Sequence, residues 1–388
     1  MLRSLSLLTR KLQQGKEIKR TLDTWNQWQP AIAALPAPQP AAEKRLLIIR
    51  LDDIGDYILF RNTLAAYRTS PRFAGYKITL LGNTIWQSLF QFADADLADE
   101  VIWVNKHTYF KEEQYRTDLW LRLRRQGFDT VVCPSRGHPL LLDDACMLAA
   151  APATSMAPAN YLHYQQWNQL SDSLYTNLYT DRTMSHEFTW NLGFASWCLG
   201  TNLLHLTLQL QAPAVDAPGK PYIVCFIGGS KKSHRWPATH WIELIEQVHK
   251  QGTYTCLLAG GPGDTGPARR IAEATGAQNL VGNITLPQLA GYLHHAAAVI
   301  TNDTMSVHMS VASGAPTLIV ANGDNFYRFG DYKSPAIGNT ENAWPQLFIK
   351  QWKKHNHKPF RHIAVTADIA TIKPAHVMHQ LRILLRDQ

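Results

Sequence analysis

The chain has 388 residues, of which 45% are hydrophobic and 18% charged, and its formal net charge at pH 7 is +8. This length and composition fit two or three domains with full-sized cores. No uninterrupted apolar stretch approaches the ~20 residues that span a bilayer, which argues against a membrane-spanning helix. The five cysteines are scattered without a CxxC pair, so we expect buried free thiols in a reducing compartment.

The N-terminal segment is basic and has the spacing of an amphipathic helix. Residues 1–20 hold six Lys or Arg and one Glu, and no cleavage site of a secretory signal is evident. Such a helix either lies on an anionic membrane or packs against the protein's own body or a second subunit. Residues 29–42, rich in Ala and Pro, predict a semi-extended linker. The apolar stripe within residues 2–27 consists of Leu5, Leu8, Leu12, Ile18, Leu22 and Trp25.

Residues 44–212 alternate apolar runs with helical stretches. The near-continuous apolar run at 45–51 is typical of a buried parallel strand. Further strands are predicted at 77–81, 100–104 and 130–133. The alternation predicts an α/β domain with a parallel sheet.

A second α/β domain, predicted at residues 219–370, follows a Pro-containing linker at 213–221. Residues 371–388 predict a terminal helix from about 374 to 386, which could pack back on the N-terminal domain. Together these segments predict two Rossmann-like, doubly wound domains that face a cleft, preceded by residues 1–43, which comprise an N-terminal basic amphipathic helix and the Ala/Pro linker. The predicted strands of the second domain are 222–227, 255–259, 297–301 and 317–320, with helices from about 237 and at 267–275.

Three carboxylates, Asp52, Asp53 and Asp56, follow the first predicted strand. The carboxyl ends of parallel strands face the ligand crevice of such sheets. Crowding should raise the pKa of at least one carboxyl, which would suit a general base. Alternatively, these residues only cap the next helix.

Two loops at the same predicted edge of the second sheet suit an anionic ligand. The first, at 228–237, combines glycines with a hydroxyl and several cations; it is either a diphosphate site or a solvated basic turn. The second, at 260–264, contains Gly261 and Asp264 and is a weaker signal on its own. The candidate residues of the first loop are Gly229, Ser230, Lys231, Lys232, His234 and Arg235.

The stretch at 302–314 joins a predicted strand to a small-residue helix. The first N–H groups of such a helix have no internal partner and can bind phosphate. Asp303 or Thr304 could also cap this helix, and His308 could simply pack.

These motifs, taken in order, resemble the bacterial heptosyltransferase group, glycosyltransferase family 9, which has the two-Rossmann GT-B architecture. The residues that carry the resemblance are Leu47 to Asp56, Arg235-Trp236-Pro237 with Trp241, Gly260-Gly261 with Asp264, and Asn302-Asp303-Thr304 with His308. The chain departs from the family pattern at Met305, where the family usually has Gly, and at His234, where it commonly has Lys. A carboxylate often seen near Pro262 is absent, and Asp264 could substitute for it.

The resemblance implies an inverting glycosyltransferase that needs no metal or cofactor and uses a nucleotide-sugar donor, with ADP-heptose favoured. It implies that Asp56 is the general base and that Asp53 and Arg136 contact the acceptor. The residues it implies for the donor diphosphate are the 228–235 loop, Gly261, Asp264, Asp303, Thr304, Met305 and His308.

The implied acceptor is a cell-envelope glycolipid such as the lipopolysaccharide core. A second basic patch, at 350–361, and the basic N-terminus suit an anionic membrane surface. We therefore expect a cytoplasmic protein, peripheral on the inner face of the bacterial inner membrane, that binds no nucleic acid. Two alternatives remain open: a degenerate GT-B protein that binds a nucleotide sugar or a partner without turnover, and a nucleotide-sugar epimerase.

Overall fold

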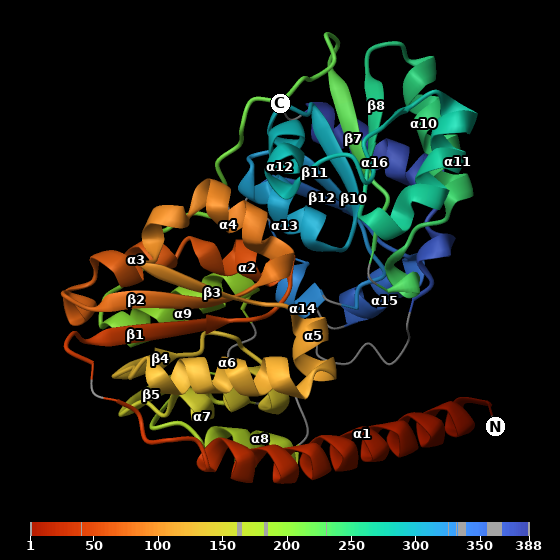
Figure 1. Cartoon of the computed structure of the whole chain (residues 1–388). Coiled ribbons are helices and arrows are strands. Elements are labelled where there is room, and N and C mark those ends of the chain that lie inside the picture. Colours follow the sequence, from red (N-terminus) through yellow and green to blue (C-terminus); the bar gives the residue numbers. More distant parts are fainter. Residues whose placement is uncertain are drawn as a thin grey trace.

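The computed structural model describes residues 2–39, 41–160, 165–181, 185–229, 231–324, 326–330, 332, 339–354 and 367–386. Two six-stranded parallel sheets form two Rossmann-like halves that lie one above the other in Figure 1. The predicted α/β, GT-B-type fold is confirmed. No described helix is both long and apolar enough to cross a membrane.

The first sheet has the order β3-β2-β1-β4-β5-β6, so the strand order reverses beside β1. Its strands are β1 Arg45–Arg50, β2 Lys77–Asn83, β3 Glu100–Val104, β4 Thr130–Val132, β5 Thr154–Pro158 and β6 Asn177–Tyr179. Its helices are α1 Leu2–Ala33, α2 Ile54–Arg61, α3 Leu64–Thr69, α4 Gln87–Ala93, α5 Lys106–Lys111, α6 Glu113–Arg125, α7 Ala145–Ala150, α8 Gln165–Asp172 and α9 Glu187–Leu199.

The second sheet, with the order β12-β11-β10-β7-β8-β9, repeats this pattern around β7. Its strands are β7 Tyr222–Phe226, β8 Thr255–Ala259, β9 Gln278–Asn279, β10 Ala298–Asn302, β11 Thr317–Val320 and β12 Thr340–Ala343. Its helices are α10 Ala238–Lys250, α11 Thr265–Thr275, α12 Leu286–His294, α13 Met305–Ala312, α14 Phe326–Phe329, α15 Gln346–Lys354 and α16 Pro374–Arg386.

One hydrophobic cluster joins the two halves. It runs from one face of the first sheet, with Leu46 and Ile48, through α2 and α13 to one face of the second sheet, with Val224 and Val299. The opposite faces of the sheets have their own clusters, which include the C-terminal part of α1 and helices α10 and α16 respectively. Because the joining cluster is continuous, the carboxyl ends of β1 and β10 are held close to each other.

Most predicted elements agree with the structure within two residues, but the two ends of the chain differ from expectation. Helix α1 extends to Ala33 and includes Pro30, so the first part of the predicted linker is helical. Trp25 and Ile32 are buried against the first half, which confirms packing on the protein's own body for this part of α1; the side chains of Leu5, Leu8 and Leu12 lie outside the described residues. Helix α16, which we expected could return to the N-terminal half, packs instead on α10, β11 and β12.

Candidate functional site

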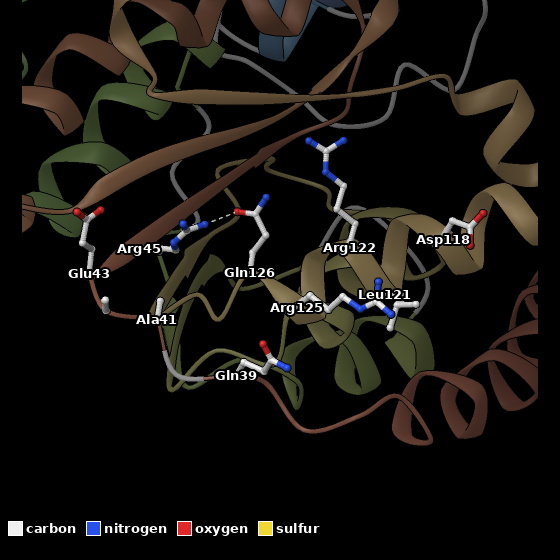
Figure 2. A pocket seen from close by; sticks show the side chains of 10 residues that line it. Gln39, Ala41, Glu43, Arg45, Asp118, Leu121, Arg122, Arg125 and Gln126 are labelled. Carbon is white, nitrogen blue, oxygen red and sulfur yellow. Dashed lines mark hydrogen bonds between the residues drawn. The ribbon is translucent and has the colours of Figure 1, made fainter.

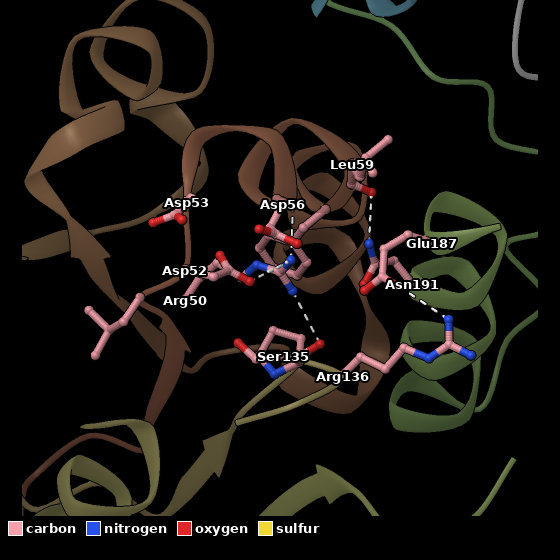
Figure 3. Close-up of polar contacts among 12 residues, drawn as sticks. Arg50, Asp52, Asp53, Asp56, Leu59, Ser135, Arg136, Glu187 and Asn191 are labelled. Atoms are coloured by element: carbon pink, nitrogen blue, oxygen red, sulfur yellow. Dashed lines mark hydrogen bonds and ion pairs between the residues drawn. The ribbon is translucent and has the colours of Figure 1, made fainter. Parts of the chain in front are cut away.

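The three carboxylates after β1 each face a cation. Asp52 pairs with the buried Arg50 at 2.8 Å, and Asp53 pairs with Lys106 at 2.6 Å. Asp56 lies in the first turn of α2, 3.7 Å from Arg328 of the second half. Asp53 occupies the N-cap position of α2 without a side-chain capping bond, so helix capping does not explain this cluster. Figure 3 shows these side chains around the end of β1.

Burial raises the pKa of Asp56 above its ordinary value, Arg328 and Arg50 oppose that rise, and Glu187 and Asp53 add to it. For Asp52, burial also raises the pKa well above the usual range, against the attraction of Arg50. The expected direction is therefore confirmed, but burial outweighs the crowding of carboxylates on which the expectation rested. A carboxyl with a raised pKa is a stronger base once ionised.

A buried ion-pair network next to Asp56 joins the two halves. Glu187 of α9 is fully buried and contacts Arg328 at 2.9 Å and Arg136 at 3.2 Å. Burial opposes ionisation of Glu187, but Arg328 and Arg136 outweigh it and lower the pKa to about 2. The predicted acceptor residue Arg136 is thus bound to a carboxylate, and Arg328 reaches from α14 into the first half.

These groups surround a cavity of about 410 Å³ at the carboxyl edge of the first sheet. It brings together Asp53, Asp56 and Arg136, whose catalytic and acceptor-binding roles stay predictions. The cavity is lined by Leu51, Asp52, Asp53, Asp56, Lys106, Ser135, Arg136, Gly137, Pro139, Leu142, Asp143 and Arg328.

A larger hollow, about 610 Å³, lies elsewhere, between the linker after α1 and helix α6 (Figure 2). None of the predicted site residues lines it. Its walls come from the side of the first half that bears Gln39, Arg45, Asp118, Arg122 and Gln126. The larger volume of this hollow therefore does not make it the candidate site. The cavity around Asp56 is the better candidate because it contains predicted site residues.

The start of α13 lies directly against the start of α2. Thr304 is the N-cap of α13 and accepts a hydrogen bond from the Ser306 N–H at 3.4 Å. A Cβ atom added to Gly55 would lie 2.6 Å from Cδ2 of His308, so this contact requires glycine. The start of α13, whose first N–H groups have no partner within the helix, is therefore brought next to the turn of α2 that carries Asp56.

His308 is buried, and its Nδ1 is hydrogen-bonded to the hydroxyl of Tyr332. Burial lowers its pKa to about 3, so the imidazole is neutral at pH 7. The burial of His308 and its hydrogen bond to Tyr332 favour the packing role, which is one of the two roles that the sequence left open. The nearby Met305 is the first residue of α13 and packs partly against the joining cluster, while Asp303 is buried at the end of β10.

The basic loop after β7 is fixed by Asn302. The Asn302 amide donates to the carbonyls of Ile227 at 2.8 Å and Gly228 at 3.0 Å, and its oxygen accepts from the Trp236 N–H at 3.2 Å. Because the amide is fully buried, losing it would leave backbone groups without partners. Asn302 therefore sets the path of the loop.

Within this loop, the side chains of Lys231 and Lys232 are exposed, and Ser230 lies outside the described residues. His234 is buried 3.2 Å from Asp324; the hydrogen bond to that carboxylate raises the pKa of His234 against the effect of burial. The guanidinium of Arg235 donates to the carbonyl of Gly229 at 2.6 Å. The two exposed lysines are thus the cations of this loop that remain available to a diphosphate.

Asp264 closes the turn after β8. Its carboxylate accepts from the Gly261 N–H at 2.9 Å, and a Cβ added to Gly228 would lie 2.4 Å from it. Arg235 lies 3.7 Å away. Asp264 therefore joins the two predicted glycine loops into one surface.

Sequence reasoning missed several polar residues of this site: Arg50, Asp143, Glu187, Asp324 and Arg328. Asp324 lies shortly after β11, so it could have been found from its place after a predicted strand, whereas Asp143 lies in the turn Leu140–Asp144, well beyond the end of β4. Glu187 and Arg328 lie on helices and offer no such local signal.

Comparisons with known proteins show similarity over part of the chain in sequence and over most of it in fold. Residues 182–347 match the model of the family "Glycosyltransferase family 9 (heptosyltransferase)". Lipopolysaccharide heptosyltransferase 1 of Pseudomonas aeruginosa is 30% identical over 101 residues, which are 26% of this chain and 28% of that protein. Among the curated relatives, the matched segment covers between 28% and 65% of their own length.

Solved structures share the fold over most of the chain. A family 9 glycosyltransferase from Veillonella parvula has a TM-score of 0.67 at 18% identity, covering 90% of this chain and 100% of that one. The E. coli heptosyltransferase WaaC with ADP has a TM-score of 0.59 at 17% identity, covering 80% of this chain and 99% of that one. At these identities the likeness establishes the fold. The family match over residues 182–347 and the curated relatives cover part of this chain, and its two facing Rossmann-like sheets share the fold of the solved structures, so the chain is similar to glycosyltransferase family 9.

Proposed function

We propose that the chain is an inverting glycosyltransferase that moves a sugar, with heptose favoured, from a nucleotide donor to a cell-envelope glycolipid such as the lipopolysaccharide core. The observation that carries this proposal is the position of Asp56. Its carboxyl lies in the cavity of the first half, beside the start of α13 and within 3.7 Å of Arg328 from the second half. In this proposal the first half supplies the base and the second half supplies the diphosphate site, and the contact of α2 with α13 brings the two together.

In the proposed reaction, the acceptor hydroxyl oxygen attacks the anomeric carbon of the donor and gives its proton to Asp56. The bond from that carbon to the diphosphate oxygen breaks on the opposite face, which inverts the configuration. Lys231, Lys232 and the N–H groups of α13 would stabilise the charge that develops on the leaving diphosphate. Arg328 and Arg50 favour the ionised form of Asp56 before the proton arrives.

ADP-heptose is the donor that we propose first. The family is described as heptosyltransferases, and a structure with this fold contains ADP. We propose no metal or cofactor, so transfer should persist in excess EDTA. The basic residues at 1–20 and 350–361, the second of which lies largely outside the described residues, would suit an anionic lipid surface, and we propose that the protein lies on the inner face of the inner membrane.

A nucleotide-binding protein without turnover is the second candidate. Met305 stands at the first position of α13, and His234 is committed to Asp324. The side chain of Met305 crowds the approach of a phosphate to the helix, and His234 is less available to a diphosphate because it is bound to Asp324.

Calorimetric titration of the full chain with ADP, UDP, GDP and CMP tests the donor site. Selective binding of ADP at micromolar concentration is expected, and absence of binding by all four nucleotides would contradict the proposal. Turnover of ADP-heptose with a lipopolysaccharide-core acceptor then separates the two candidates. If the Asp56→Ala variant and the wild type bind ADP equally and neither transfers sugar, the second candidate is correct.

A further inference from the structure

Half of the wall of the cavity around Asp56 comes from one short segment. Six of the twelve described residues that line the cavity lie between positions 135 and 143, and the predicted acceptor residue Arg136 is one of them. The segment begins in the loop after β4 and continues into a single π-helical turn, Leu140–Asp144. Residues 135–143 form no strand. Their position therefore depends on side-chain contacts rather than on the hydrogen bonds of a sheet.

His138 lies in the middle of this segment but does not line the cavity. Its side chain is fully buried, and both of its ring nitrogens have partners. Nδ1 lies 2.6 Å from Oδ1 of Asp144, and Nε2 lies 2.9 Å from the carbonyl oxygen of Pro158. A backbone carbonyl oxygen can only accept a hydrogen bond, so Nε2 carries a proton.

The carboxylate of Asp144 is surrounded by donors. The hydroxyl of Tyr175 donates to it at 2.8 Å and the hydroxyl of Ser171 at 2.5 Å. Because a carboxylate that receives these protons acts as an acceptor, the proton between Asp144 and His138 belongs to Nδ1. With a proton on each nitrogen, the ring of His138 is an imidazolium. Burial opposes this charge, but the attraction of Asp144 outweighs it and raises the pKa of His138 to about 9.

The contacts of His138 join three parts of the first half. Pro158 is the last residue of β5, Ser171 of α8 lies 3.0 Å from Nδ1, and Asp144 ends the π-helical turn. The backbone carbonyl of His138 also accepts from the side-chain amide of Asn160 at 3.2 Å. Removing the imidazolium would leave Asp144 as a buried carboxylate without its cation and would release the segment from β5. One side chain thus holds half of the cavity wall in place.

We propose that His138 is a positioning residue of the glycosyl transfer: its imidazolium, bound to Asp144 and Pro158, holds the segment 135–143 in the shape that places Arg136 at the acceptor side of the cavity. This inference rests on the proposed function, because it concerns the acceptor side of the same reaction. A wall that moves orients the acceptor poorly, and a misplacement of about 1 Å can cost up to about 10²-fold in rate. The proposed donor site lies on the other half, so nucleotide affinity should not depend on His138.

Nitrogen-15 NMR of the histidine rings in the full chain, at pH 8, tests the protonation of His138. We expect one imidazole to show protons on both nitrogens, and the signal should be absent from the spectrum of His138→Asn. His308, which burial keeps neutral with a pKa of about 3, provides the reference for an uncharged ring. A His138 ring that is neutral at pH 8 would overturn the inference.

Steady-state kinetics with ADP-heptose and a lipopolysaccharide-core acceptor test the positioning role. His138→Leu removes both donations and should raise the acceptor KM by roughly 10–100-fold, with the Kd for ADP within about twofold. His138→Asn keeps a donor toward Asp144 and should show a smaller rise. Leu199→Ala is the control, because it removes a buried side chain from the cluster on the other face of the first sheet. It should lower stability in urea without changing the acceptor KM.

An acceptor KM that stays unchanged in His138→Leu would overturn the inference, and so would a parallel loss of acceptor and ADP binding, which indicates general unfolding. If the Leu variant does not fold, an unchanged acceptor KM in His138→Asn overturns it, because that variant also loses the charge and the bond to Pro158. A wild type that transfers no sugar refutes the proposed function, whereas normal transfer with a neutral His138 refutes this inference alone.

Discussion

Replacing Arg328 with Ala removes a guanidinium that contacts carboxylates of the opposite half. Glu187 loses a partner at 2.9 Å and keeps Arg136 at 3.2 Å. Breaking a buried ion pair from one side costs about 3–5 kcal/mol. Because one cation remains, we expect the lower end, about 3 kcal/mol of unfolding free energy.

The same substitution acts on Asp56, whose side chain is 26% exposed and lies 3.7 Å from Arg328. Two unit charges at about 4 Å interact by about 4 kcal/mol at an effective dielectric constant of about 20. Solvent screening at this partly exposed pair reduces that figure to about 1–2 kcal/mol, which corresponds to roughly one pKa unit. Loss of the cation raises the pKa of Asp56 further, so more of the base is protonated at a given pH.

The assay is the pH dependence of kcat/KM for sugar transfer, together with urea denaturation. The acid limb of the profile should move up by about one pH unit in Arg328→Ala and partly return in Arg328→Lys. Arg269→Ala, which removes an exposed cation paired with Glu273 on α11, is the control and should move neither quantity. An acid limb that stays in place, or moves to lower pH, would refute the assignment of Asp56 as the base that Arg328 tunes.

Three further changes have defined expectations. Asp56→Asn should lower kcat by about 10²–10⁴-fold while leaving the Kd for ADP within about twofold, since it removes proton transfer and keeps the shape; calorimetry and initial rates check this, and retained turnover would count against it. Gly55→Ala should cost about 1–3 kcal/mol in urea denaturation, because its Cβ meets His308 at 2.6 Å; an unchanged midpoint would show that the halves separate easily. His308 has a folded-state pKa of about 3, below its ordinary value of 6.5, so its contribution to stability is present above pH 6.5 and is lost as the pH falls toward 3. The wild type should therefore lose more stability than His308→Gln between pH 7 and pH 5, and parallel loss in the two proteins would disprove this.

The sequence predicted the sheets well because buried parallel strands leave a local pattern. Apolar runs such as the one before Asp52 need no partner information to be recognised. The strands β5, β6, β9 and β12 were missed because their sequences, TSMAP, NLY, QN and TENA, contain no continuous apolar run that distinguishes them from loops. Helix α1 extended past its predicted end because burial of Ile32 stabilises its last turns despite Pro30.

The site was predictable only in part, for a similar reason. Asp56 and Thr304 were found because strand ends and helix starts are visible in the sequence. Glu187 and Arg328 are 141 residues apart in the sequence. Their ion pair forms only when the two halves are in contact, so no local pattern predicts it. His308 was predicted to lie at the donor site, a prediction that stays open, and its burial against Gly55 depends on a helix contact that no local pattern encodes.

The attachment of α1 has a mechanical consequence. Trp25 and Ile32 fix the C-terminal part of this helix to the first half, and its N-terminal part extends away from the body in Figure 1. At about 1.5 Å per residue, the 32-residue helix is about 48 Å long. A surface that held the extended part would restrain the half that carries Asp56 directly, and the half that carries Thr304 only through the cluster that joins the two halves.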